Sequence, residues 1–261
     1  MVTWSKFGAI SCTHCPFQNE RAIGKLLNEL KGRRLDHFFH LGDVIDAGGT
    51  ASAHKNKSDA VEHSLYDEYM IAADMLRRIR EALPKDCKLH LLDGNHDDNV
   101  QRKEGNRRIP KDLRTLCNPR KMAVVCEEYN QWEHTPYRFE KSGIVILGAV
   151  CFCHGWSTAS EELEAIEIAN ICGAVPHRLI VKGHTHRPVP PTQCKRTAKV
   201  KLPWHYCNVG HMAFPDGAPD YAQRFSTDSW GAAVCFGETI VSQRSSRLGK
   251  GSWRAQLISL D

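Results

Sequence analysis

The chain has 261 residues, of which 41% are hydrophobic and 25% charged, with a formal net charge of +5. These values are ordinary for a globular protein and exclude a mainly disordered chain, while the mild positive charge permits a polyanionic partner without requiring one. No secretory signal and no apolar stretch of membrane-spanning length is visible, which predicts a cytoplasmic protein. The odd count of 11 cysteines at scattered spacings predicts reduced thiols rather than a disulfide framework.

The first half of the chain alternates short apolar runs with amphipathic segments, which predicts strands and helices in turn. A strand is expected within the first twelve residues. Helices are expected over 19–30 and 58–83, because leucines and isoleucines recur there at helical spacing. Further strands are expected over 38–41 and 89–92.

The second half predicts shorter elements within a single domain that spans residues 1–261. Segment 99–121 is polar and basic and reads as an insert. A hairpin is expected from 137–139 and 144–152, followed by a helix over 161–172 and a strand over 179–181. Pro188, Pro190 and Pro191 indicate a loop. The remaining strands are expected over 205–209, 232–236, 239–241 and 254–258.

Most of the predicted strands that precede residue 187 end in a short cluster of histidine, aspartate, asparagine or cysteine. These clusters are Cys12-x-His14, Gly42-Asp43-x-x-Asp46, Gly94-Asn95-His96-Asp97, His154-Gly155 and Gly183-His184-x-His186. Each of them alone is more often an ordinary turn or a core histidine. In open α/β sheets, however, ligands bind outside the carboxyl ends of strands, and imidazole and oxygen ligands suit Zn, Mn and Fe. The ordered set therefore predicts a metal site.

This ordered set resembles the calcineurin-like metallophosphoesterase family. The resemblance implies an α/β fold, a four-layer sandwich of two mixed β-sheets flanked by helices. It also implies two divalent metal ions and attack on phosphorus by a hydroxide that bridges them. By position, Asp43 would bridge the metals, and His96 would act as general acid or phosphate contact with Asp46 to orient it. The remaining ligands would be Cys12, His14 and His186 at the first metal, and Asn95, His154 and His184 at the second.

Position 12 departs from the family pattern, which has aspartate there. In one interpretation Cys12 is a thiolate ligand, which would favour Zn or Fe over Mn at the first site. In the other, Cys12 is not a ligand and the first site is weak or vacant. We favour ligation, because the rest of the set is intact.

Two further departures bear on the substrate. Protein phosphatases of the family usually carry arginine where this chain has Ala47, and glutamate where it has Asp97. Both departures favour phosphodiesters, and we expect these to be in nucleic acid or nucleotides. The alternatives are a small-molecule phosphomonoesterase and a catalytically impaired metal-binding scaffold.

Two basic clusters could hold a polyanion if both face the site, although solvated surface loops explain them equally well. They are Arg102, Lys103, Arg107, Arg108, Lys111 and Arg114, and then Lys195, Arg196, Lys199 and Lys201.

Overall fold

The computed structural model describes residues 3–47, 64–106, 114–137, 143–157, 160–173, 177–197, 199–214, 227–241 and 252–261. The described strands form two sheets. The first has six strands in the order β11-β10-β1-β2-β3-β4. Four of them run parallel, namely β1 (Trp4–Ile10), β2 (His37–His40), β3 (Lys88–Leu92) and β4 (Glu133–Thr135). Strand β10 (Ala233–Ile240) is antiparallel to β1, and β11 (Trp253–Ser259) is antiparallel to β10.

The second sheet has five strands in the order β5-β6-β7-β9-β8. Its parallel centre consists of β6 (Val150–Cys153), β7 (Leu179–Lys182) and β9 (Val200–Val209). The edge strands β5 (Ile144–Leu147) and β8 (Pro188–Thr197) pair antiparallel with β6 and β9. Both sheets are therefore mixed.

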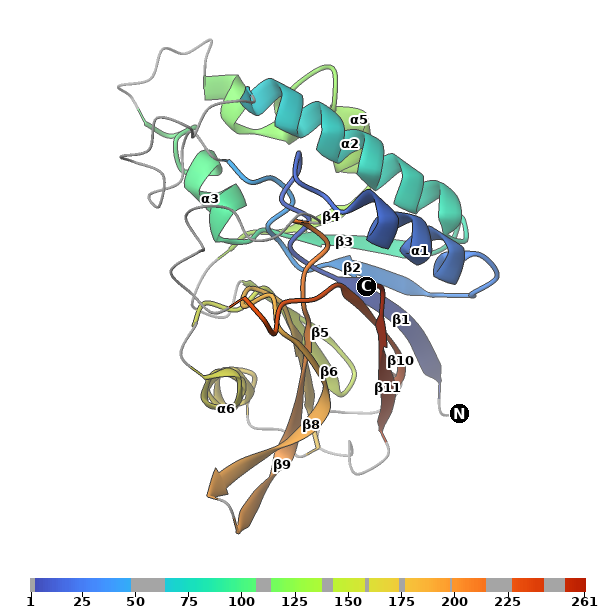
Figure 1. Ribbon diagram of the computed structural model, residues 1–261, viewed down its shortest axis with the longest axis vertical. Coiled ribbons are helices and arrows are strands. Elements are labelled where there is room, and N and C mark those ends of the chain that lie inside the picture. The colour runs from blue at the N-terminus through green and yellow to red at the C-terminus, as the bar shows by residue number, and fades with distance from the viewer. Residues whose placement is uncertain are drawn as a thin grey trace.

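Helices cover the outer face of each sheet, so that the molecule has four layers (Figure 1). Helices α1 (Glu20–Leu30) and α2 (Leu65–Ala82), with the short α5 (Cys126–Asn130), pack on the first sheet around Leu26, Phe38 and Leu76. Phe7, Phe39 and Phe152 fill the space between the sheets. Helix α6 (Glu161–Ile171) packs on the second sheet through Ile168, which lies against Ile180. The predicted four-layer sandwich of two mixed sheets flanked by helices is confirmed.

Polar side chains fix where the long helices begin. Asn19 caps α1 by accepting a hydrogen bond from the Ala22 amide at 3.0 Å. Ser64 and Asp67 form a capping box at the start of α2, and Ser160 caps α6. The part of the predicted second helix before residue 64 lies outside the described residues.

Several predicted elements were wrong. The expected strand over 144–152 is two antiparallel strands, because the chain turns at Gly148, where φ is +56° and a Cβ would lie 2.1 Å from the Ile240 carbonyl oxygen. Strands 232–236 and 239–241 are one continuous β10. The proline-rich loop is β8, which tolerates three prolines because it is an edge strand with register shifts.

The expected hairpin partner over 137–139 falls largely outside the described residues. In the expected insert over 99–121, the described part contains the end of α3 (Asn95–Gln101) and the one-turn helices η2 (Thr115–Cys117) and η3 (Pro119–Lys121). No helix among the described residues is both long enough and apolar enough to cross a membrane.

Candidate metal centre

The predicted ligands lie on turns that follow the carboxyl ends of β1, β2, β3, β6 and β7. Strands β1, β2 and β3 of the first sheet run parallel, as do β6 and β7 of the second sheet. The turns at their carboxyl ends therefore meet at one edge of the sandwich. Left-handed backbone, with φ between 44° and 73°, occurs at Cys12, His14, Asp43, His184 and His186. Such strain in residues other than glycine persists only where the surroundings enforce it, and it concentrates at functional sites.

The turn that carries Asp43 is held by the next turn in the sheet. The carboxylate of Asp97 accepts hydrogen bonds from the amides of Asp43 at 2.7 Å, Val44 at 3.2 Å and Gly94 at 2.8 Å. Gly94 is needed here, because a Cβ at this position would lie 2.1 Å from Asp43 Oδ1. The His96 amide donates to the same oxygen at 3.0 Å. The Asp43 carboxylate is therefore fixed from two sides.

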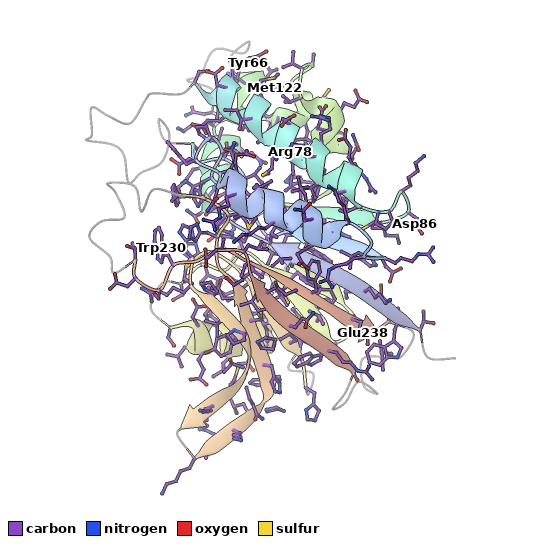
Figure 2. All side chains as sticks on the ribbon, turned by 45° about the vertical axis from the view of Figure 1, so that its right-hand side comes forward. Tyr66, Arg78, Asp86, Met122, Trp230 and Glu238 are labelled. Atoms are coloured by element: carbon purple, nitrogen blue, oxygen red, sulfur yellow. The ribbon has the colours of Figure 1, made fainter. Side chains whose placement is uncertain are left out.

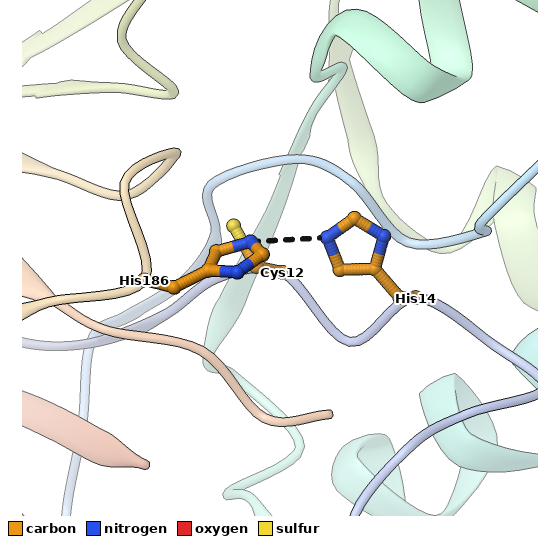
Figure 3. Close-up of side chains that lie close together, drawn as sticks. All are labelled: Cys12, His14 and His186. Atoms are coloured by element: carbon orange, nitrogen blue, oxygen red, sulfur yellow. Dashed lines mark hydrogen bonds between the residues drawn. The ribbon is translucent and has the colours of Figure 1, made fainter. Parts of the chain in front are cut away.

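The first group of candidate ligands is Cys12, His14 and His186, whose ligand atoms lie within 4.8 Å of one another (Figure 3). His14 Nδ1 donates a hydrogen bond to Asp46 Oδ1 at 3.0 Å, so in the neutral ring Nε2 carries the lone pair that can bind a metal. That Nε2 lies 3.2 Å from His186 Nε2 and 3.7 Å from Asp43 Oδ2. Burial raises the pKa of the Cys12 thiol, and the negative charge of Asp43 raises it further. A nearby cation is therefore required for this group to be a thiolate.

The second group gathers around His154. Its Nδ1 donates a hydrogen bond to the Leu41 carbonyl at 2.8 Å, which fixes the ring. In the neutral ring, Nε2 then carries the lone pair that can bind a metal. Nε2 lies 3.1 Å from Asp43 Oδ2, 3.3 Å from Asn95 Oδ1 and 3.2 Å from His184 Nδ1. Burial, followed by the effect of His154, lowers the pKa of His184 to about 3, so His184 is neutral.

These two groups fit divalent cations. The Nε2 lone pairs of His14 and His154 converge with the Oδ2 atom of Asp43 in a buried space. These electron-rich atoms repel one another unless a positive charge lies between them. Burial lowers the pKa of His154, but Asp43 and the Leu41 carbonyl outweigh it and raise the pKa overall. The same negative surroundings that raise this pKa favour a cation at the centre. The donors are nitrogen, oxygen and sulfur atoms, which suit Zn and Fe.

The residues predicted to act on protons differ in one contact from expectation. The carboxylate of Asp46 was expected to orient His96, but it lies closer to His14, at 3.0 Å against 3.9 Å for His96 Nδ1. Instead, His96 Nδ1 lies 2.5 Å from the main-chain carbonyl of Asp46. Asp46 thus contacts both histidines, one through its side chain and the other through its backbone.

A buried polar network that the sequence did not reveal supports the turn carrying His184 and His186. Asn208 Nδ2 donates to the Gly183 carbonyl at 3.0 Å and to Thr185 Oγ1 at 2.8 Å. The same nitrogen lies 3.1 Å from Glu161 Oε1, and Lys182 Nζ donates to Glu161 Oε2 at 2.6 Å. A lysine at the end of an otherwise apolar strand was the available signal, because a buried lysine requires carboxylate partners.

Aromatic side chains beside His186 were also missed. Trp230 lies edge-on to His186, with ring centroids 4.4 Å apart, and His211 lies 5.2 Å from His186. Phe214 lies 5.1 Å from His14. These residues come from the last third of the chain, where no motif or period points to the site.

The second basic cluster does not border the candidate metal centre. Lys195, Arg196, Lys199 and Lys201 lie near the tip of the β8–β9 hairpin, which projects away from the other strands (Figure 1). The end of β9 that reaches the site is separated from Lys201 by eight residues of strand, or roughly 25 Å. The idea that both clusters face the site was therefore wrong. In the first cluster, Arg107, Arg108 and Lys111 lie outside the described residues.

A cavity of about 480 Å³ lies elsewhere, on the outer face of the first sheet near Arg33, Phe236 and Glu238. Figure 2 shows Glu238 on the opposite side of the molecule from Trp230. The lining of this cavity contains none of the candidate ligands. We therefore place the chemistry at the ligand cluster and not in the cavity.

A protein-family model, described as a calcineurin-like phosphoesterase superfamily domain, matches residues 6–228. The chain belongs to this family. Calcineurin-like phosphoesterases are metal-dependent phosphoester hydrolases, and the Cys, His and Asp cluster agrees with that assignment. No curated protein matches the sequence.

Solved structures resemble this calcineurin-like phosphoesterase at low sequence identity. A metallophosphoesterase from Sphaerobacter thermophilus is 15% identical with a TM-score of 0.46, and the alignment covers 98% of this chain and 88% of that one. A predicted phosphoesterase from Streptococcus pneumoniae is 11% identical with a TM-score of 0.37, covering 99% and 100%. Vps29 from Entamoeba histolytica, solved with Zn²⁺, is 12% identical with a TM-score of 0.41, covering 98% and 99%.

Proposed function

We propose that this protein is a two-metal phosphodiesterase that acts on nucleotides or nucleic acid. Cys12, His14, Asp43 and His186 would hold one divalent cation. Asp43, Asn95, His154 and His184 would hold the other. The observation that carries the proposal is the position of Asp43 Oδ2, which lies 3.7 Å from His14 Nε2 and 3.1 Å from His154 Nε2. One carboxylate oxygen thus faces both ligand groups.

The chemistry that bound divalent cations supply is neutralisation of the phosphoryl oxygens and acidification of water. The protein's own residues orient the substrate and manage protons around that centre. The Asp46 carbonyl lies 2.5 Å from His96 Nδ1 and fixes the ring, and Nε2 would be the atom that donates a proton to the leaving oxygen. Burial lowers the pKa of His96, but Asp43 and Asp46 raise it overall, which favours the protonated donor.

A preference for diesters is supported by the surroundings of Ala47. Its side chain is a methyl group, and its amide donates to Glu68 Oε2 at 2.8 Å. Both residues are buried. A monoester dianion needs more positive charge than a diester monoanion. Position 47 supplies no guanidinium group, and the carboxyl group of Glu68 lies close to it. This position therefore suits the diester, which is the less charged substrate.

We expect the metal-loaded protein to hydrolyse bis-p-nitrophenyl phosphate faster than p-nitrophenyl phosphate. A missing charged contact is worth roughly 1.5–3 kcal/mol, so the ratio of kcat/KM should be about 10–150. Release of p-nitrophenolate measures both reactions with the same leaving group. Faster hydrolysis of the monoester would instead establish a phosphomonoesterase. Bound metal without turnover of either ester would establish a non-catalytic scaffold.

Cys12→Asp should move the metal preference from Zn or Fe towards Mn, because a hard oxygen replaces a soft sulfur. Aspartate tolerates the left-handed backbone at this position, where φ is 55°. The variant should also resist peroxide, whereas we expect peroxide to inactivate the parent protein by consuming the thiolate. Competition between metals, followed by elemental analysis, measures the first effect, and residual activity after peroxide measures the second.

Cys15→Ala is the matched control, because Cys15 is buried in the same loop but belongs to none of the candidate ligand groups. It should change neither the metal preference nor the sensitivity to peroxide. If Cys12→Asp behaves as this control does, Cys12 is not a ligand.

A further inference from the structure

A row of aromatic rings lies beside the first ligand group. Phe214 is 5.1 Å from His14 and 6.0 Å from His186, measured between ring centroids. Trp230 is 4.4 Å from His186 and 6.2 Å from Phe214. Phe17 continues the row at 6.1 Å from Phe214. We call Phe17, Phe214 and Trp230 the aromatic face.

The aromatic face is anchored by main-chain hydrogen bonds to the turns that carry the ligands. The Phe214 amide donates to the Phe17 carbonyl at 2.8 Å, and the Phe17 amide donates to the His14 carbonyl at 2.7 Å. Next to Trp230, the Gly231 amide donates to the His186 carbonyl at 3.2 Å. The rings are therefore placed by the same backbone that places His14 and His186, and their distance from the metal centre is fixed.

The three rings differ in their exposure to solvent. Phe214 is 9% exposed and supports the ligand histidines, whereas Phe17 is 40% exposed and Trp230 is partly exposed. Support of the histidines alone explains Phe214, but it does not explain why large aromatic rings remain open to solvent next to the reacting centre. Trp230 is the partly exposed ring that lies beside His186, and a ring in that position can receive another planar ring.

We propose that the aromatic face stacks on the nucleobase of a nucleotide phosphodiester whose phosphate lies at the metal centre. This inference rests on the proposed function and names the substrate class for the same site. No member of the face is charged, and stacking accepts every base because each base has a π-face. The face should thus favour nucleotides over simple alkyl diesters without selecting among bases.

The test compares two diesters with the same leaving group, thymidine 5′-(p-nitrophenyl phosphate) and methyl p-nitrophenyl phosphate. Trp230→Leu in the full-length, metal-loaded protein should lower kcat/KM for the thymidine ester about 10-fold. It should leave the methyl ester within about 2-fold. Trp230→Phe keeps an aromatic ring and should restore most of the loss. Tyr66→Leu, which removes an exposed ring on α2, is the control and should alter neither ester.

An equal loss on both esters after Trp230→Leu would show that Trp230 only supports His186, and it would overturn the proposal. Calorimetric binding of adenosine 5′-monophosphate and ribose 5-phosphate to the zinc-loaded protein gives a second readout that does not need turnover. The nucleotide should bind about 10-fold more tightly, and Trp230→Leu should remove the difference. If neither ester is hydrolysed, the proposed function fails, while this binding difference still decides the inference. Equal binding of the two phosphates would reject it.

Discussion

Asp43→Asn should lose most of the bound metal and nearly all hydrolytic activity. The substitution keeps the shape of the side chain and removes the charge that faces both His14 Nε2 and His154 Nε2. No other carboxylate among the described residues takes part in more than one of the candidate ligand groups. Loss of stabilisation of the phosphoryl charge should lower kcat by on the order of 10³-fold or more. Elemental analysis and turnover of a diester measure the two losses.

Asp93→Asn is the matched control for this experiment. Asp93 is also buried at the end of a strand, but its carboxylate pairs with His134 at 2.7 Å and accepts from Gln101 at 3.0 Å. This variant should keep its metal and most of its activity. Full metal content and normal turnover in Asp43→Asn would remove Asp43 from the centre of the site.

The fold class predicted from the sequence is confirmed, and the candidate site residues predicted with it lie close together in space. Turn motifs such as Gly94-Asn95-His96-Asp97 are local, and they become a cluster as soon as parallel strands bring their carboxyl ends together. All of the predicted ligands do lie together, although what each one binds stays a prediction. The prediction used residue types that surface turns seldom combine, so it could be made from a single sequence.

Long-range structure was less predictable. The prolines of β8 indicate a loop by local chemistry, and only the position of that strand at a sheet edge makes them acceptable. The Asp46 carboxylate lies closer to His14 than to His96 by about an ångström, a difference that side-chain placement in three dimensions decides. Trp230 reaches His186 from 44 residues further along the chain, and no periodicity can announce such a contact.

His96→Ala should keep both metals and slow hydrolysis by roughly 10²–10⁴-fold, because it removes a positioned proton donor that belongs to neither proposed ligand set. His96 does lie with His14 and Asp43 in a group that could hold an ion, so the metal content of the variant is measured as well. The loss should shrink for a diester whose leaving group needs no proton, such as p-nitrophenolate, and should be largest for an alkoxide.

Asp46→Asn is the informative comparison. It alters the group that holds His14 at 3.0 Å but retains the main-chain carbonyl that holds His96 at 2.5 Å. It should therefore impair metal binding while keeping the parent's dependence on the leaving group. If His96→Ala slows good and poor leaving groups equally, His96 binds phosphate and does not donate the proton.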